Sequence, residues 1–303
     1  MATKILVPIV VIIVAIAAFA AGFYSYPLLV KPPEVKPTVT PTVTVTVTST
    51  TTVPAVKKDV WEDVTKRGYI IVGTSPDWPP FEYLDPKTGK LIGFEVELME
   101  MIAKELGLEV KWKTMDFATI IPAVKNKEID LGVSGFSITP ERLEEVRFTI
   151  PHTVTECQLI MVKERAEELG ITRLKDLSEI AKYGLVVGAG SGTTQEAELM
   201  DLISKGVIPS GSLRSYEKYD VALEDMLMGR IDAVYAETPI TTWWGMTAGK
   251  ELVVVYSRSY WPVAFVAHKD ADILVSKING VLAKLISEGK VDELREKWSK
   301  PSE

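Results

Sequence analysis

The chain has 303 residues, and its 41 acidic residues outnumber 34 basic ones, which gives a formal net charge of −7. It is too long for one compact core of ordinary size. An acidic chain without a basic stripe is a poor candidate for phosphate-backbone binding, so we expect no nucleic-acid partner. The single cysteine, Cys157, excludes an internal disulfide, and His152 and His268 lack ligand-like spacing. We therefore expect no metal and no cofactor.

The first segment of the chain is apolar. From Ile5 to Val30 no residue is charged, and a helix of that length, at about 1.5 Å per residue, spans a bilayer core. A cleaved signal peptide is one interpretation, with cleavage sites at the small residues Ala17, Ala18, Ala20 and Ala21. An uncleaved anchor is favoured, because the run continues to Tyr24 and Tyr26, which suit a membrane interface. We expect residues 1–30 to anchor the protein to the membrane, with the rest of the chain on the extracellular face. If this segment is cleaved, we expect a secreted protein.

Residues 31–56 differ in composition from the apolar run. From Pro37 to Pro54 the chain consists of Thr, Val, Pro and Ser, without a charge. The alternation over 42–47 has the period of a strand, but a strand needs a partner and prolines bracket this one. Thr- and Ser-rich sequence with proline is typical of an extended stalk that can carry O-glycans. We therefore expect a low-complexity linker before a globular domain at 57–303, whose formal charge is about −9 once the three lysines and one glutamate of the first 56 residues are set aside.

Strand-like and helix-like segments alternate along this domain. We expect strands at 69–73, 108–112, 130–133, 159–162, 185–187 and 231–235. We expect helices at 94–106, 117–126, 172–180, 193–204 and 219–229, and two helices within 271–298 that are broken near Gly289. Such alternation predicts an α/β fold with mostly parallel sheets, in which ligands bind at the carboxyl ends of the strands.

Polar or special residues follow four of the expected strands, in the stretches 75–81, 134–142, 188–194 and 236–239. In the third stretch, glycines precede a helix start, where free N–H groups and the helix dipole favour an anion. A tight turn with Ser191 or Thr193 as helix cap is the alternative. A dinucleotide fingerprint fits poorly, because Thr193 stands where its third glycine belongs, and a phosphate loop would need a lysine.

Four side chains are candidates for holding a small ligand, and each has a structural alternative. The Arg142 guanidinium can grip a carboxylate with two hydrogen bonds, or it can pair with neighbouring glutamates on the surface. Trp78 and Phe117 can wall a pocket, or they can belong to the core. Glu237 can be the counter-charge of an amine, or it can lie near a helix cap.

These stretches occur in the order found in a known family. The matching segments are 72–82, 93–98, 115–117, 121–123, 129–130, 137–142, 191–195, 229–233 and 237–239. Over nearly all of 60–299 the chain resembles the family 3 extracellular solute-binding proteins, the polar amino-acid receptors of ABC importers. The resemblance implies a periplasmic-binding-protein fold of type II. Its lobe 1 would be 57–155 plus 255–303 and its lobe 2 would be 156–254, joined by strands that cross near 156–158 and 254–256.

The resemblance also assigns roles in a cleft between the lobes. It implies that Arg142 pairs with a ligand α-carboxylate, that Glu237 holds the ammonium, and that Trp78 and Phe117 enclose the side chain. The expected ligand-binding set is Ser75, Trp78, Phe117, Ser134, Gly135, Ser137, Arg142, Gly190, Thr193, Thr194 and Glu237. Two positions depart from the family pattern. Ser75 replaces a frequent aspartate, which argues against a strongly basic ligand, and Glu237 replaces an aspartate, which lengthens its reach.

The implied function is that of a monomeric receptor that delivers an amino acid to an ABC transporter permease, without catalysis. Two alternatives stay open. Cyclohexadienyl dehydratases resemble these receptors, and in such an enzyme Glu237 or Glu156 would be the general acid. A sensory receptor domain is the other alternative.

Overall fold

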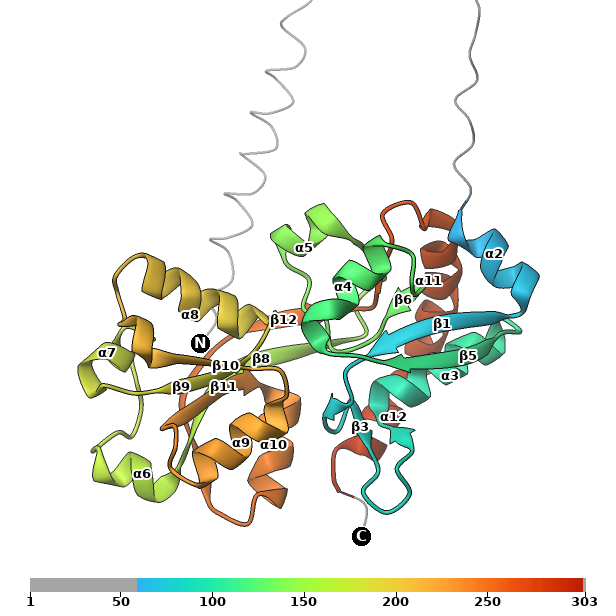
Figure 1. The fold of residues 1–303 in the computed structure, drawn as a ribbon. Coiled ribbons are helices and arrows are strands. Elements are labelled where there is room, and N and C mark those ends of the chain that lie inside the picture. The colour runs from blue at the N-terminus through green and yellow to red at the C-terminus, as the bar shows by residue number, and fades with distance from the viewer. Residues whose placement is uncertain (1–58, 302–303) are drawn as a thin grey trace, which may run out of the picture. The chain divides into compact units, whose positions relative to one another are not determined.

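The computed structural model describes residues 59–301 (Figure 1). The expected anchor at 1–30 and the expected stalk at 31–56 lie outside the described residues. Within the described part, no helix combines the length and the apolar character needed to cross a membrane.

The first lobe is built on a five-stranded sheet. Its strand order is β5 (Glu109–Thr114), β1 (Tyr69–Thr74), β6 (Leu131–Gly132), β13 (Val266–Ala267) and β7 (Arg147–Phe148). β1 pairs in parallel with both β5 and β6, whereas β13 is antiparallel to its neighbours. The helices of this lobe are α2 (Val60–Arg67), α3 (Phe94–Glu105), α4 (Phe117–Lys125), α5 (Pro140–Glu145), α11 (Asp272–Ser287) and α12 (Lys290–Trp298). A small sheet of β2 (Asp77–Trp78), β3 (Glu82–Leu84) and β4 (Leu91–Ile92) extends it.

The second lobe has its own five-stranded sheet. The strand order is β10 (Leu213–Tyr216), β9 (Val187–Gly190), β11 (Ala233–Glu237), β8 (Thr153–Val162) and β12 (Leu252–Val263). β9 pairs in parallel with β10 and β11, and β8 is antiparallel to β11 and β12. Its helices are α6 (Lys163–Glu168), α7 (Glu179–Tyr183), α8 (Thr194–Ser204), α9 (Tyr219–Leu227) and α10 (Thr238–Thr247), with a 3-10 turn at Ser210–Ser212.

Strands β8 and β12 connect the two lobes, and Figure 1 shows them running between the sheets. They pair from Leu252 opposite Val162 to Val263 opposite Thr153. The end at Val263 attaches to lobe 1, since it forms a bridge with Ser137 and accepts a hydrogen bond from the backbone N–H of His152. The predicted crossing segments 156–158 and 254–256 lie on these two strands. The lobe boundaries that we placed at 155/156 and 254/255 stay predictions.

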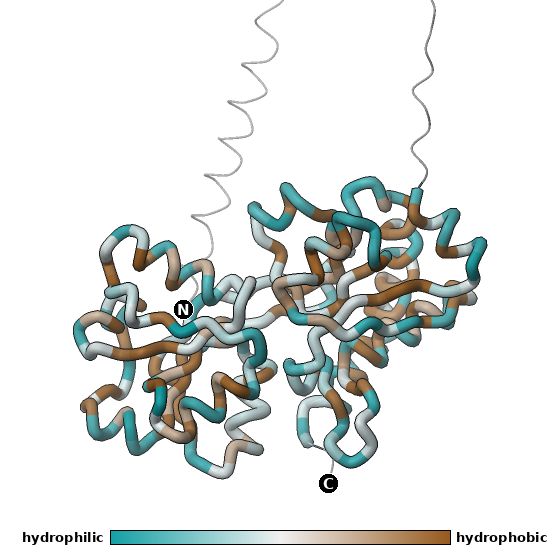
Figure 2. The backbone as a smooth tube through the Cα atoms, viewed as in Figure 1, coloured by the Kyte–Doolittle hydropathy of each residue, from teal (hydrophilic) through white to brown (hydrophobic). Residues whose placement is uncertain are grey.

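The inner strands of each sheet are largely apolar and buried, and helices cover them. Ile70, Val72 and Leu131 in lobe 1 and Leu159, Val187 and Ala233 in lobe 2 have exposed fractions of 0%. Burying one Leu or Ile side chain contributes about 1.5–3 kcal/mol. Figure 2 shows hydrophobic residues along both sheets and hydrophilic residues on the outer turns and helix surfaces.

The expected α/β architecture is confirmed, and two element predictions are wrong. No helix spans 172–180: α7 starts at Glu179, and α6 precedes this stretch. The backbone N–H of Leu174 donates to the Val255 carbonyl of β12 (2.7 Å), and the Leu174 and Leu177 side chains are buried. This stretch therefore packs against the sheet and does not form a helix. The strand expected at 185–187 is β9 at Val187–Gly190.

Gly190, at the end of β9, allows the strand to lie close to the ring of Tyr219. A Cβ atom on Gly190 would lie 2.7 Å from the ring of Tyr219, too close for any other residue. Gly190 therefore accommodates a tyrosine of α9, in addition to bordering the pocket described next.

Candidate functional site

A pocket lies between the two lobes. Its lining residues are Ser75, Asp77, Trp78, Glu82, Phe117, Ser134, Gly135, Ser137, Arg142, Gly190, Ser191, Thr193, Thr194, Gln195, Glu217, Tyr219 and Glu237. All eleven residues of the expected ligand-binding set are among them. Lobe 1 contributes the residues from 75 to 142, and lobe 2 contributes those from 190 to 237.

Arg142 is held by the pocket walls rather than by surface glutamates. It lies in the first turn of α5, where Thr139 caps the helix and Pro140 starts it. The guanidinium donates to the Ser137 carbonyl (3.0 Å) and, across the lobe boundary, to the Gly192 carbonyl (3.1 Å). Burial lowers the pKa of Arg142 to about 10, against the opposing effect of the Glu237 charge, so the group stays positively charged at neutral pH.

An aromatic pair supports this guanidinium. Phe117 and Phe136 stack with centroids 4.7 Å apart, and the guanidinium carbon of Arg142 lies 5.5 Å from each centroid. Cation–π contact of this kind holds the planar group in one orientation. Phe117 is therefore both a wall of the pocket and a support for its cation.

Glu237 lies at the deep end of the pocket, where β11 passes into α10, and only 5% of it is exposed. Its carboxylate accepts hydrogen bonds from Ser137 Oγ (2.8 Å), Gln195 Nε2 (3.1 Å) and Thr155 Oγ1. A carboxylate offers about four lone-pair sites, so these three neutral donors leave room for one more. Ser137 belongs to lobe 1, so Glu237 also joins the two lobes.

Two adjacent threonines at the start of α8 have different roles. Thr193 is the helix cap: its Oγ1 accepts from the Glu196 backbone N–H (3.2 Å) and donates to the Gly190 carbonyl (2.6 Å). The structural alternative that we considered for Thr193 is thus present. Thr194 Oγ1 is buried without a hydrogen-bond partner, although the residue lines the pocket. Buried hydroxyls are normally paired, so this group is available to a ligand.

Trp78 occupies space that only a glycine leaves open. A Cβ atom on Gly135, whose φ is +59°, would lie 1.7 Å from the Trp78 ring. The ring therefore packs directly on the backbone after β6, and it also meets Phe81 edge to face at 5.2 Å. Trp78 is 9% exposed, so it belongs to the core as well as to the pocket wall.

The lobe 1 end of the pocket is acidic. Glu82 is fully buried and accepts a hydrogen bond from Ser134 Oγ (2.9 Å), while its second oxygen has no partner. Burial raises the pKa of Glu82 well above its usual value, and the nearby Glu95 charge raises it further. Glu95 is buried behind it and is held by the Gly135 N–H (2.9 Å) and by His152 (2.8 Å). Burial also raises the pKa of Asp77.

Sequence reasoning missed six of the lining residues: Asp77, Glu82, Ser191, Gln195, Glu217 and Tyr219. Asp77, Ser191 and Gln195 lie inside or next to stretches that we had identified, so their position after a strand was an available signal. Glu217 and Tyr219 follow β10, whose strand pattern is too short to detect in the sequence.

The pocket has four carboxyl groups and one guanidinium among its lining residues. Its opposite charges, Arg142 and Glu237, can bind the carboxylate and the ammonium of a zwitterion. Among the described residues, no group of three or more His, Cys, Asp or Glu side chains could hold a metal ion.

A domain of two α/β lobes joined by two strands, with a small polar pocket between them, has the periplasmic-binding-protein type II fold. This chain belongs to the bacterial extracellular solute-binding proteins, family 3, whose family model matches residues 70–301.

Relatives of known name agree with this assignment. The chain is 28% identical to the arginine-binding extracellular protein ArtP of Bacillus subtilis over 233 residues, which are 76% of this chain and 85% of that protein. A mutant of ArgBP from T. maritima matches with a TM-score of 0.70 and 30% identity, over 78% of this chain and 97% of that one. The ancestral amino acid-binding protein AncCDT-1, a precursor of cyclohexadienyl dehydratase, matches with a TM-score of 0.70 and 28% identity, over 80% and 100% of the two chains.

Proposed function

We propose that this protein is the extracellular solute-binding component of an ABC importer and that it delivers an amino acid to a membrane permease. The observation that carries the proposal is the interlobe pocket in which Arg142 and Glu237 present opposite charges. The Arg142 guanidinium and the Thr194 hydroxyl would together bind the ligand α-carboxylate. Its ammonium would bind the remaining acceptor site of Glu237. The amino-acid ligands of the relatives support the same assignment.

The ligand that fits best carries a cationic side chain. Four carboxyl groups and one guanidinium line the pocket, so carboxyl groups remain after a zwitterion has been matched. Glu82 has a buried oxygen without a partner, on the side of the pocket that Trp78 borders. Ser75 argued against a basic ligand, because it lacks the carboxylate often found there. Glu82 offers a carboxyl group at a neighbouring position, and a ligand cation beside it would favour its ionised form. The arginine-binding relative supports this choice.

The cleft would act as a receptor site rather than as a catalytic site. Three neutral donors hold Glu237, which suits a fixed counter-ion better than a group that must exchange a proton with substrate. Incubation with prephenate or arogenate tests this part, because release of an aromatic product would show an enzyme instead.

The remaining expectations concern the cell surface. We propose that the uncharged run at 5–30 tethers the protein to the membrane, that residues 31–56 form the stalk, and that the domain acts as a monomer. Protease treatment of intact cells, followed by fractionation, tests this arrangement. A membrane-bound fragment that retains the first 30 residues is expected, whereas a mature chain beginning after residue 21 would show cleavage.

Isothermal titration calorimetry of the full chain against the twenty standard amino acids and L-citrulline tests the function. We expect one-to-one binding, with L-arginine far tighter than its neutral isostere L-citrulline, because citrulline cannot match the excess carboxylates. Equal affinity for both would contradict the cationic side chain and leave the receptor function standing. No heat with any amino acid would contradict the function itself.

A further inference from the structure

Helix α9 begins in lobe 2 without a cap of its own. The residue before it, Lys218, is extended and has only donor groups on its side chain, so it forms no capping hydrogen bond. Further along the first turn, the Val221 N–H donates to Asp220 Oδ1 (2.8 Å), and the Ala222 N–H donates to the Lys218 carbonyl (3.4 Å). The N–H of Tyr219, which points out of the start of the helix, needs an acceptor from elsewhere.

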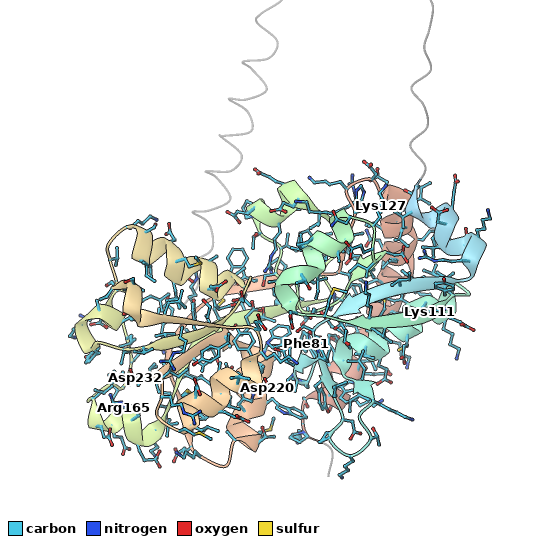
Figure 3. The ribbon with its side chains drawn as sticks, viewed as in Figure 1. Phe81, Lys111, Lys127, Arg165, Asp220 and Asp232 are labelled. Atoms are coloured by element: carbon cyan, nitrogen blue, oxygen red, sulfur yellow. The ribbon has the colours of Figure 1, made fainter. Side chains whose placement is uncertain are left out.

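The missing acceptor comes from the other lobe. Asp77, in β2 of lobe 1, accepts the Tyr219 N–H on Oδ2 (2.9 Å), while its Oδ1 accepts from Ser75 Oγ (2.6 Å). Figure 3 labels Asp220 in this first turn of α9 and Phe81 in the facing loop after β2. The carboxylate also lies at the positive end of the helix dipole, which adds to the attraction.

A second aspartate makes the same kind of contact within one lobe. α11 likewise has no side-chain cap, and Asp59 supplies one: its Oδ2 accepts from Ile273 N–H (2.9 Å) while its Oδ1 caps α2 through Trp61 N–H (2.7 Å). Both partners of Asp59 belong to lobe 1, so this contact persists whether the lobes are open or closed. The contact of Asp77 joins lobe 1 to lobe 2, so it depends on how close the lobes lie.

We propose that Asp77 is an affinity-determining residue that acts by capping α9 across the cleft and so stabilises the closed state, rather than by contacting the ligand. This rests on the proposed function, since it concerns closure around a bound amino acid. An interaction present only in the closed state raises the apparent affinity for every ligand that the closed state binds. In the open state the Tyr219 N–H returns to water and the helix start loses its acceptor.

Substitutions of Asp77 itself separate capping from ligand contact through charge. Asp77→Asn keeps an oxygen acceptor for the Tyr219 N–H and removes the charge, whereas Asp77→Ala removes both. Asp77→Ala should weaken binding about tenfold, the effect of an ordinary helix cap. Asp77→Asn should weaken binding about threefold or less.

The measurement is the dissociation constant of the full chain for L-arginine, L-citrulline and L-glutamine, by calorimetry, in the wild type, Asp77→Asn and Asp77→Ala. Asp77→Ala should weaken each ligand that binds by the same factor. Asp59→Ala is the control: it should lower the melting temperature and leave affinity unchanged. A loss for arginine alone, or an equal loss in Asp77→Asn and Asp77→Ala, would show that Asp77 acts through its charge on the ligand and would overturn the proposal. If the wild type binds no amino acid, the proposed function fails and this inference fails with it.

Discussion

At the scale of single residues, Arg142 is the group on which ligand binding should depend most. Two backbone carbonyls and two phenylalanine rings hold its guanidinium in the pocket, and only one of those carbonyls, that of Gly192, lies in lobe 2. Arg142→Ala should weaken binding by about 2–5 kcal/mol, because the ligand carboxylate would be left without its partner. Arg142→Lys keeps the charge but loses the planar guanidinium, so its affinity should lie between those of the wild type and Arg142→Ala.

Calorimetry measures this loss, and a thermal melt without ligand is the control. The melting temperature of Arg142→Ala should stay within about 2 °C of the wild type, because α5 is short and exposed. Unchanged affinity in Arg142→Ala would remove the central role that we give to this guanidinium.

Glu82 should make the stability of the unliganded protein depend on pH. Burial raises its pKa in the folded state above the ordinary value of 4.5, so the folded state binds this proton more tightly than the unfolded chain does. The resulting stabilisation is complete below about pH 4.5 and is lost as the pH rises through the folded-state pKa. Glu82→Gln cannot ionise, so this loss of stability at high pH should disappear in the variant. Its melting temperature should exceed that of the wild type at pH 8 and approach it at pH 4.

Melting curves from pH 4 to pH 9 check the Glu82 prediction. Glu217→Gln makes the same change in an exposed carboxyl group of the same pocket, so it should show no such trend. A constant difference between Glu82→Gln and the wild type at every pH would contradict the assignment.

The residues of the pocket could be predicted from the sequence where they belong to motifs that follow strands. Arg142, Glu237 and Thr194 are of this kind. The contact between Asp77 and Tyr219 could not be predicted from the sequence. It depends on the distance between the two lobes, and no local sequence pattern encodes that distance. The unusual local signal was Lys218, a cationic residue at a position where helices prefer an acceptor.

At the scale of elements, the start of α8 separates a structural threonine from a ligand-binding one. Thr193→Val should lower the free energy of unfolding by about 1 kcal/mol, because the cap of α8 is lost. Thr194→Val should leave stability unchanged or raise it, since the hydroxyl that it removes is buried without a partner. It should instead weaken amino-acid binding.

Chemical denaturation and calorimetry on the two matched variants test this division of roles. The proposed role of Thr194 would be refuted if Thr194→Val bound the ligand as tightly as the wild type.

The elements that periodicity predicted well are the long ones with an apolar face. α3, α11 and α12 lie within about two residues of expectation, and Gly289 separates the last two as predicted. Prediction failed at α6, where six residues from Lys163 to Glu168 carry almost no apolar spacing. It failed again over 172–178, because Leu174 bonds to β12, and a contact with a strand some eighty residues away leaves no local trace.

At the scale of the whole domain, three hydrogen bonds between described residues outside the connecting strands β8 and β12 cross the cleft. They are Ser137 to Glu237, Arg142 to the Gly192 carbonyl, and Tyr219 N–H to Asp77. Each joins a residue of lobe 1 to one of lobe 2, and the first two involve groups proposed to hold the ligand. A ligand that binds both Arg142 and Glu237 thus favours closure through the same contacts that bind it.

The account depends on a zwitterion whose two charged groups are bound at once, and capped ligands test this most directly. Calorimetry of the full chain should compare the tightest-binding free amino acid with its α-amide and its Nα-acetyl derivative. If L-arginine binds tightest, these are L-argininamide and Nα-acetyl-L-arginine. Each derivative should bind at least about a hundredfold more weakly, because a buried charge in the pocket loses its partner. Equal binding of either derivative would contradict the pairing with Arg142 and Glu237.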